Sequence, residues 1–111
     1  MSADAAAIDH TLSALADPVR RRAVELLGQR PHRAGELAET LGVAPSVMSK
    51  HLRVLRQGGL VSETHPDFDA RVRIYTLDAA AMTGLRAWLD TAEAGWAEQL
   101  TAFRNHLRNK R

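Results

Sequence analysis

Residues 34–57 carry apolar side chains at helical spacing, interrupted once by a short turn. Gly42 can take the left-handed backbone conformation that ends a helix, and Pro45 suits the first position of the next helix, where its missing N–H costs nothing. Gly58 and Gly59 then end this second helix. The pattern predicts two helices joined by a tight turn. Their buried faces are predicted to carry Leu37, Ala38, Leu41, Met48, Leu52 and Leu55.

Two amphipathic helices are predicted before this pair, the first over residues 3–16 and the second over residues 18–28. Asp17 fits the N-cap of the second helix and Pro18 its first position. Residues 29–33 are expected to form a connecting loop. The apolar side of the first helix carries Ile8, Leu12 and Leu15.

Residues 60–77 have the pattern of a β-hairpin. Residues 60–65 form a short strand pattern, and residues 66–70 place proline and aspartate in roles that they commonly fill in turns. Residues 71–77 alternate basic or polar with apolar side chains, which is typical of a half-buried strand. One face of this strand is predicted to carry Val72, Ile74 and Thr76, and the other face Arg71, Arg73, Tyr75 and Leu77.

The last segment, residues 79–109, is predicted to be one helix of roughly 45 Å at about 1.5 Å per residue. Its apolar stripe repeats at steps of three and four, close to a coiled-coil seam. A helix longer than its own domain needs another surface to cover that stripe, and we expect a second copy of the chain to supply it, with help from the first helix. The stripe comprises Leu85, Leu89, Ala92, Trp96, Leu100, Phe103 and Leu107. The expected dimer interface comprises Ile8, Leu12, Leu89, Ala92, Trp96, Leu100 and Phe103.

Charge is distributed unevenly along the chain, whose net charge is only +2. Between Glu39 and Glu63 there is no carboxylate, whereas Lys50, Arg53 and Arg56 all lie in this window. A solvated helix normally mixes both signs of charge, so the one-sided window favours a polyanion such as double-stranded DNA. The pair of helices over residues 34–57 therefore has the features of a helix-turn-helix, whose second helix enters the major groove.

The arginines Arg20, Arg21 and Arg22 stand near the start of a predicted helix, where cations oppose the helix macrodipole. Two interpretations remain open for them, namely contact with phosphate and simple solubility. Arg71 and Arg73 of the hairpin are predicted to reach phosphate or a minor groove; the alternative is that they are solvated side chains of a structural hairpin.

Composition excludes several functions. The 111 residues suit one domain, and the absence of cysteine removes disulfides, thiolate metal sites and cysteine nucleophiles. No glycine-rich phosphate loop or paired acid and base is evident, so an enzyme is not expected. We expect no membrane span and a cytoplasmic location, because the alanine-rich start does not resemble a signal peptide.

Four segments of the chain resemble the ArsR/SmtB-type winged helix-turn-helix repressors. They are Ala14–Arg21 (ALADPVRR), Ala34–Ala38 (AGELA), Met48–Leu55 (MSKHLRVL) and Gly59–Val61 (GLV). The resemblance implies a mainly helical fold with a small β-hairpin (ααααββα). It also implies a bacterial homodimer, formed through the first and last helices, that represses transcription at a palindromic operator until a signal releases it. The matching recognition-helix positions are Pro45, Ser46, Val47, Ser49, Lys50, His51 and Arg53. His51 borders the buried stripe, so a packed and hydrogen-bonded histidine is the alternative to a base contact.

The chain departs from the family's metal-sensing members. It lacks their Cys-x-Cys motif, and on the last helix Asp90 is followed two positions later by Ala92, where those members have histidine. His106 is followed three positions later by Asn109 rather than glutamate. We therefore expect no cofactor or metal at those sites. Two other metal ligand sets remain open, one of His65, Asp67 and Asp69 and one of His10 and His106 across a dimer.

Other departures leave the control of the protein open. Ala44 stands where the family usually has a serine or threonine N-cap. A small apolar inducer near Trp88 and Trp96 is one hypothesis, and control by the protein's own abundance is another. The sequence predicts a sequence-specific DNA-binding regulator, most simply a repressor. The alternative is a winged-helix module that binds protein and not DNA.

Overall fold

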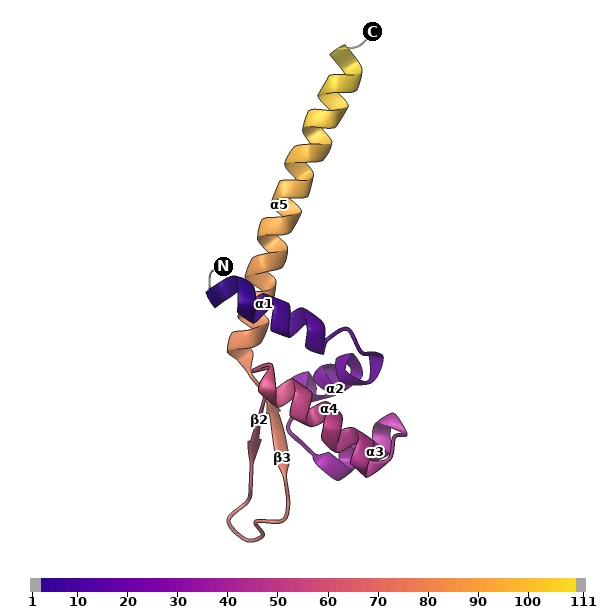
Figure 1. Ribbon diagram of the computed structural model, residues 1–111, viewed down its shortest axis with the longest axis vertical. Coiled ribbons are helices and arrows are strands. Elements are labelled where there is room, and N and C mark those ends of the chain that lie inside the picture. The colour runs from indigo at the N-terminus through magenta and orange to yellow at the C-terminus, as the bar shows by residue number, and fades with distance from the viewer. Residues whose placement is uncertain (1–2, 110–111) are drawn as a thin grey trace.

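Two arms extend from a packed group of helices in the computed structural model, which describes residues 3–109. One arm is a β-hairpin and the other is the long last helix, and they point in opposite directions (Figure 1). The elements in chain order are α1 (Ala3–Ala14), α2 (Pro18–Gln29), β1 (His32–Arg33), α3 (Ala34–Leu41), α4 (Pro45–Gln57), β2 (Val61–Thr64), β3 (Ile74–Leu77) and α5 (Ala79–Asn109). This is the mainly helical, winged helix-turn-helix arrangement that the sequence predicted.

Three helix boundaries form where the local sequence predicted them, whereas α1 ends at Ala14 and not at the predicted Ala16. Asp17 caps α2, its side-chain oxygen accepting hydrogen bonds from the backbone N–H groups of Val19 and Arg20. Gly42 ends α3 with φ of 67°, and Pro45 is the first residue of α4. These signals depend only on neighbouring residues, because a cap satisfies the unpaired backbone groups of the adjacent turn.

The core lies beneath α4. Its largest fully buried side chains come from α3, α4 and the residue before β2: Leu37, Met48, Leu52, Leu55 and Leu60. The predicted stripe of α4 is therefore the buried one, and Leu37, Ala38 and Leu41 of α3 face it. Of α5, only the first turns reach this core, where Ala81 and Met82 pack against it.

The sheet differs from the predicted two-stranded hairpin. Residues 32–33, expected to lie in a loop, form β1 and pair antiparallel with β3, so that the strand order is β1-β3-β2. A strand of two residues is too short to show an alternating pattern, and only the approach of β3 makes it a strand. The observed order within residues 3–109 is therefore ααβααββα and not ααααββα.

The second hairpin strand is shorter than predicted, and of its two predicted faces the one with Tyr75 is buried. It begins at Ile74, because Asp69 holds the preceding residues in a turn by accepting from the backbone N–H of Arg71 and, through its carbonyl, from that of Val72. Tyr75 is 2 % exposed, whereas Ile74 is half-buried. The buried face is thus the one that carries Tyr75. We call residues 61–77 the wing.

Substituting Gly42 with alanine is expected to lower the free energy of unfolding by about 1–2 kcal/mol, because a left-handed backbone costs that much for a residue with a Cβ. The matched control is Gly35→Ala, since Gly35 is helical in α3 and an added Cβ meets nothing within 4 Å. This control is expected to raise the stability by about 0.5–1 kcal/mol. Urea denaturation of both variants checks the signs, and a loss at both positions would contradict the backbone explanation.

Candidate nucleic-acid interface

Helix α4 presents a polar and basic face beside the wing. Ser46, Val47, Lys50 and Arg53 are exposed, and Ser49 is half-buried. The first turn of α4 contains no acidic residue, and Ala44 at the N-cap offers no side-chain hydrogen bond. This face therefore combines a hydroxyl, a methyl-bearing side chain and two cations, the groups that contact base edges and phosphates.

His51 is placed away from this face. Its side chain is 16 % exposed, and its Nδ1 lies 3.3 Å from Arg20 Nη1 and 4.0 Å from Asp17 Oδ1. The structure thus places His51 in the packed alternative, against the start of α2. It remains among the positions matched to the family's recognition helix, but its ring nitrogen lies against α2.

Arg20 and Arg21 both donate hydrogen bonds to backbone carbonyls of the segment that precedes α2. Arg20 Nε donates to the carbonyl of Ala14 at 2.6 Å, and Arg21 Nη1 donates to the carbonyls of Leu15 and Ala16 at 2.9 and 3.0 Å. These carbonyls lie at and just after the end of α1, where no intrahelical donor is left for them. The cations at the start of α2 therefore cap the preceding helix. The signal in the sequence was the very short gap between the two helices.

The two wing arginines have different surroundings. The side chain of Arg71 is 93 % exposed and its Nε lies 3.2 Å from Asp69 Oδ1. Arg73 is half-buried, and its Nη2 donates to Ser49 Oγ at 3.0 Å. Arg71 therefore remains at the surface, where a phosphate would be accessible to it, whereas Arg73 contacts the helix that carries the predicted base-reading residues.

A half-buried carboxylate joins the wing to the end of α4. Glu63 accepts a hydrogen bond from Tyr75 OH at 2.8 Å and another from Arg56, and its Oε1 lies 3.2 Å from His65 Nε2. Burial raises the pKa of Glu63, but the hydrogen bond from Tyr75 and the nearby cations lower it more, so the pKa lies below its ordinary value. Burial and the same hydrogen bond raise the pKa of Tyr75 above 10.0.

These shifts predict a loss of stability at each end of the pH scale. A lowered carboxyl pKa stabilises the fold above the unfolded pKa, so the free energy of unfolding is expected to fall as pH drops below about 4.5. A raised tyrosine pKa stabilises the fold below pH 10.0, and this contribution is lost as pH rises through the raised value. In Tyr75→Phe we expect a shallower acid decline and no tyrosine-dependent alkaline decline, measured by urea denaturation across pH.

The matched control for this pair is Glu36→Gln. The backbone hydrogen bond from Arg33, followed by the side-chain bond from Arg30, lowers the pKa of Glu36. The control is therefore expected to reduce the acid decline and to leave the alkaline decline unchanged. Curves for Tyr75→Phe that run parallel to those of the unsubstituted protein would contradict the assignment.

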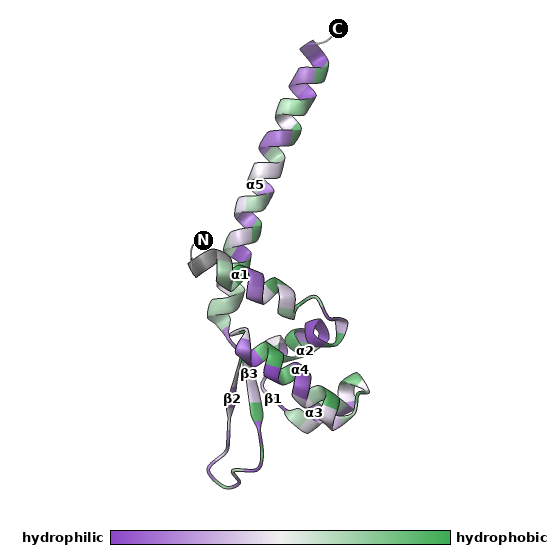
Figure 2. Ribbon diagram, viewed as in Figure 1, coloured by the Kyte–Doolittle hydropathy of each residue, from purple (hydrophilic) through white to green (hydrophobic). Residues whose placement is uncertain are grey.

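The apolar stripe of α5 is uncovered in the single chain. Trp96, Leu100 and Phe103 are 60–64 % exposed, and the green bands along the projecting part of α5 show that its apolar residues recur far beyond the packed helices (Figure 2). Of the other residues predicted for a dimer interface, Leu12 and Leu89 are exposed, and Ile8 and Ala92 are half-buried.

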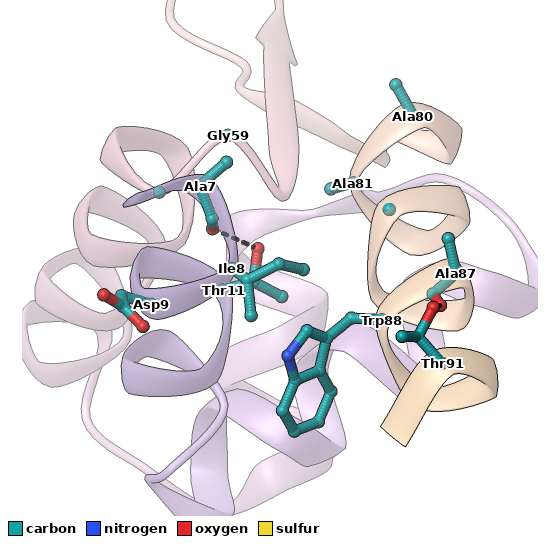
Figure 3. Close-up of a pocket in the computed structure, with 12 residues that line it drawn as sticks. Ala7, Ile8, Asp9, Thr11, Gly59, Ala80, Ala81, Ala87, Trp88 and Thr91 are labelled. Carbon is teal, nitrogen blue, oxygen red and sulfur yellow. Dashed lines mark hydrogen bonds between the residues drawn. The ribbon is translucent and has the colours of Figure 1, made fainter. Parts of the chain in front are cut away.

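A cavity of about 780 Å³ lies between α1, the start of α5 and the glycines after α4. Trp88 and Ile8 line it, while Trp96 does not, so the two tryptophans of the inducer hypothesis do not share one site in the single chain. Figure 3 shows Ile8 and Thr11 extending from α1 toward the Trp88 ring on α5. Most of the remaining wall is alanine and glycine.

Of the two open metal hypotheses, only the set of His65, Asp67 and Asp69 lies within one chain, since a site of His10 and His106 requires a second copy. Within the part of the chain that the structure describes, no three histidine, aspartate or glutamate side chains gather closely enough to hold a metal ion. His65 Nδ1 lies 3.0 Å from the carbonyl of Val72, and Asp69 is paired with Arg71. His10 lies in α1 and His106 in the last turn of α5.

None of the helices within residues 3–109 has the length and hydropathy of a membrane span.

Comparison with known proteins adds independent information. The family model described as a helix-turn-helix domain matches residues 15–64. The HTH-type transcriptional regulator Rv2034 of Mycobacterium tuberculosis is 37 % identical over 95 residues, which cover 86 % of this chain and 83 % of that protein. The transcriptional repressor SdpR of Bacillus subtilis is 30 % identical over 56 residues, covering 50 % of this chain and 62 % of that protein. A solved ArsR-like transcriptional regulator from Rhodococcus sp. RHA1 is 27 % identical, with a TM-score of 0.75 over 90 % of this chain and 92 % of that one.

Proposed function

Because the chain belongs to the ArsR family of winged helix-turn-helix transcriptional regulators, we propose that it acts as a dimeric repressor at a palindromic operator. Its relatives are regulators of transcription and not enzymes. The Bacillus subtilis relative is a transcriptional repressor, and we extend this activity to the present chain.

The observation that carries the proposal is the exposed face of α4. Its outward side chains are Ser46, Val47, Lys50 and Arg53, and no carboxylate interrupts them. In our proposal these residues read bases in the major groove, with Pro45 starting the helix and Ser49 beside them. Arg71 on the wing contacts phosphate, which positions the protein without reading sequence.

The dimer completes this arrangement. A second copy covers the exposed stripe of α5, together with Ile8 and Leu12 of α1, since a single chain leaves that stripe in water. A two-fold axis between the copies places two α4 helices on half-sites about one turn of DNA apart, roughly 34 Å. Operator palindromy follows from that symmetry.

In our proposal a small apolar inducer binds in the cavity between α1 and α5. Gly58 and Gly59 form part of its wall and directly follow α4, so an occupant would touch the end of the recognition helix. Trp88 is the aromatic side chain available to it. Control by abundance alone remains the alternative, and the operator-binding assay below is also a screen for inducers.

Lys50→Ala is expected to lower the affinity for the operator about tenfold, and the affinity for scrambled DNA by less. A contact to a base adds to the electrostatic attraction between lysine and DNA only when that base is present in the duplex. Fluorescence anisotropy measures both, using a duplex from upstream of the chain's own gene and its scrambled version over a salt series. The charge-matched control is Arg86→Ala on α5, an exposed cation outside α4 and the wing.

Three results would change the assignment. Equal losses on both duplexes would make Lys50 a phosphate contact. Equal weak binding of the unsubstituted protein to both duplexes would place the operator elsewhere. Absence of binding even at low salt would favour the protein-interaction module instead.

A further inference from the structure

A continuous chain of hydrogen bonds joins the wing to two separate points of α4. At one end, Arg56 and Tyr75 both donate to Glu63, the latter at 2.8 Å. At the other end, Arg73 donates to Tyr75 OH at 3.5 Å and to Ser49 Oγ at 3.0 Å. We call these five residues the α4–wing network. Ser49 and Arg56 are seven positions apart, two helical turns on one side of α4.

Two attachment points on one side of a helix restrain both its rotation and its sliding. The network therefore holds α4 against the sheet at the edge that faces the wing, while the buried stripe packs the adjacent side of the helix. Tyr75 is 2 % exposed and Glu63 is half-buried, so water competes little for the central bonds.

Arg73 is occupied within this network. A guanidinium has only donors, and two of its nitrogens are directed to Tyr75 and Ser49. Arg71, two residues earlier, has the exposure that a phosphate contact requires, and its side-chain partner is Asp69 on the same turn. The two wing arginines, which look equivalent in sequence, therefore have different tasks.

The contact from Arg73 also favours the Ser49 hydroxyl as a hydrogen-bond donor toward other groups. A serine hydroxyl has one hydrogen to donate and two lone pairs that accept, and here a cation occupies one lone pair. Accepting from a charged donor strengthens the hydroxyl as a donor. The nearby positive charge also opposes the amino groups of adenine and cytosine, while guanine O6 and N7, adenine N7 and thymine O4 accept hydrogen bonds.

We propose that Arg73 is a positioning residue for sequence readout, which orients the Ser49 hydroxyl as a donor to a base acceptor in the major groove and locks the wing to α4. This inference rests on the proposed DNA-binding function. It assigns Arg73 to base discrimination through Ser49, and not to a phosphate or a minor groove.

The test uses binding selection from duplexes with a randomised central stretch, followed by anisotropy on the selected and a scrambled duplex. The proteins are the unsubstituted chain, Ser49→Ala, Arg73→Gln and the double variant. Both single variants are expected to lose preference at the same base pair, with about a tenfold lower ratio of selected to scrambled affinity. The double variant is expected to lose no more than either, because the two residues act as one unit.

Two further variants isolate the role of charge. Arg71→Gln removes the same charge from the wing and is expected to leave every base preference intact. Arg73→Lys keeps the charge but cannot reproduce the paired hydrogen bonds to Tyr75 and Ser49. It is therefore expected to bind scrambled DNA normally and still lose the base preference. It also carries the test if circular dichroism shows that Arg73→Gln is unfolded.

The opposite results overturn the inference. If Arg73→Gln weakens both duplexes equally and reduces the salt slope by about one, Arg73 is a phosphate contact. If its loss adds to that of Ser49→Ala, or if base preference is unchanged, the two residues are not coupled in readout. If the unsubstituted chain enriches no sequence, the proposed function itself fails, which is a separate result.

Discussion

Leu100→Glu is expected to convert the protein into single chains and to lower its operator affinity by roughly 10²–10⁴-fold, the usual gain from linking two binding events. Leu100 is 64 % exposed on α5, in the middle of a stripe that continues through Trp96 and Phe103. In the proposed dimer this side chain is buried against the partner, and a carboxylate there has no counter-charge on the stripe. Sedimentation equilibrium reports the mass, and anisotropy reports the affinity.

The neighbouring position provides the matched control. Thr101 is also exposed, but it lies on another side of α5, with Glu98 and Asn105. Thr101→Glu introduces the same charge one residue later and is expected to leave both the mass and the affinity unchanged. A dimer that survives Leu100→Glu, or one that both substitutions disrupt, would show that the stripe is not the interface.

Leu52→Ala is expected to lower the free energy of unfolding by about 2–5 kcal/mol, the range observed for truncating a buried leucine. Leu52 is fully buried at the centre of α4, between Met48 and Leu55. The truncation removes apolar contacts and leaves a cavity under the helix that carries the proposed base-reading residues. Urea denaturation at fixed protein concentration measures the change, since association would otherwise alter the apparent stability.

Val54→Ala is the control for this truncation. Val54 is two residues away on the same helix and 37 % exposed. Its replacement is expected to change the stability by no more than about 0.5 kcal/mol, as for most surface substitutions. Similar losses at the two positions would mean that helix propensity, and not burial, controls the stability of α4.

The sequence was informative wherever a structural decision is local. The N-cap at Asp17, the left-handed Gly42 and the start of α4 at Pro45 each depend on residues within one turn. The stripe of Met48, Leu52 and Leu55 depends on helical periodicity, which a linear sequence displays directly. From these features the helix-turn-helix and its outward face could be predicted without any tertiary information.

The roles of the polar side chains could not be predicted in the same way. Arg20 contacts His51, which is 31 positions away, and Arg73 contacts Ser49 at a separation of 24. Arg71 and Arg73 carry the same charge on the same predicted strand face, yet only one of them reaches α4. Their difference arises from the turn at Asp69, which ends the regular alternation on which the face assignment depended.

By itself, then, the sequence determined the helices, their caps, the buried side of α4 and the family to which the chain belongs. These depend on short-range backbone chemistry and on periodic burial. The tertiary structure alone decided that residues 32–33 form a strand, that Tyr75 faces inward, and that Arg73 contacts the recognition helix. Each of these outcomes requires two distant segments to meet, because a hydrogen bond or a buried ring depends on the partner that the fold brings within a few ångströms.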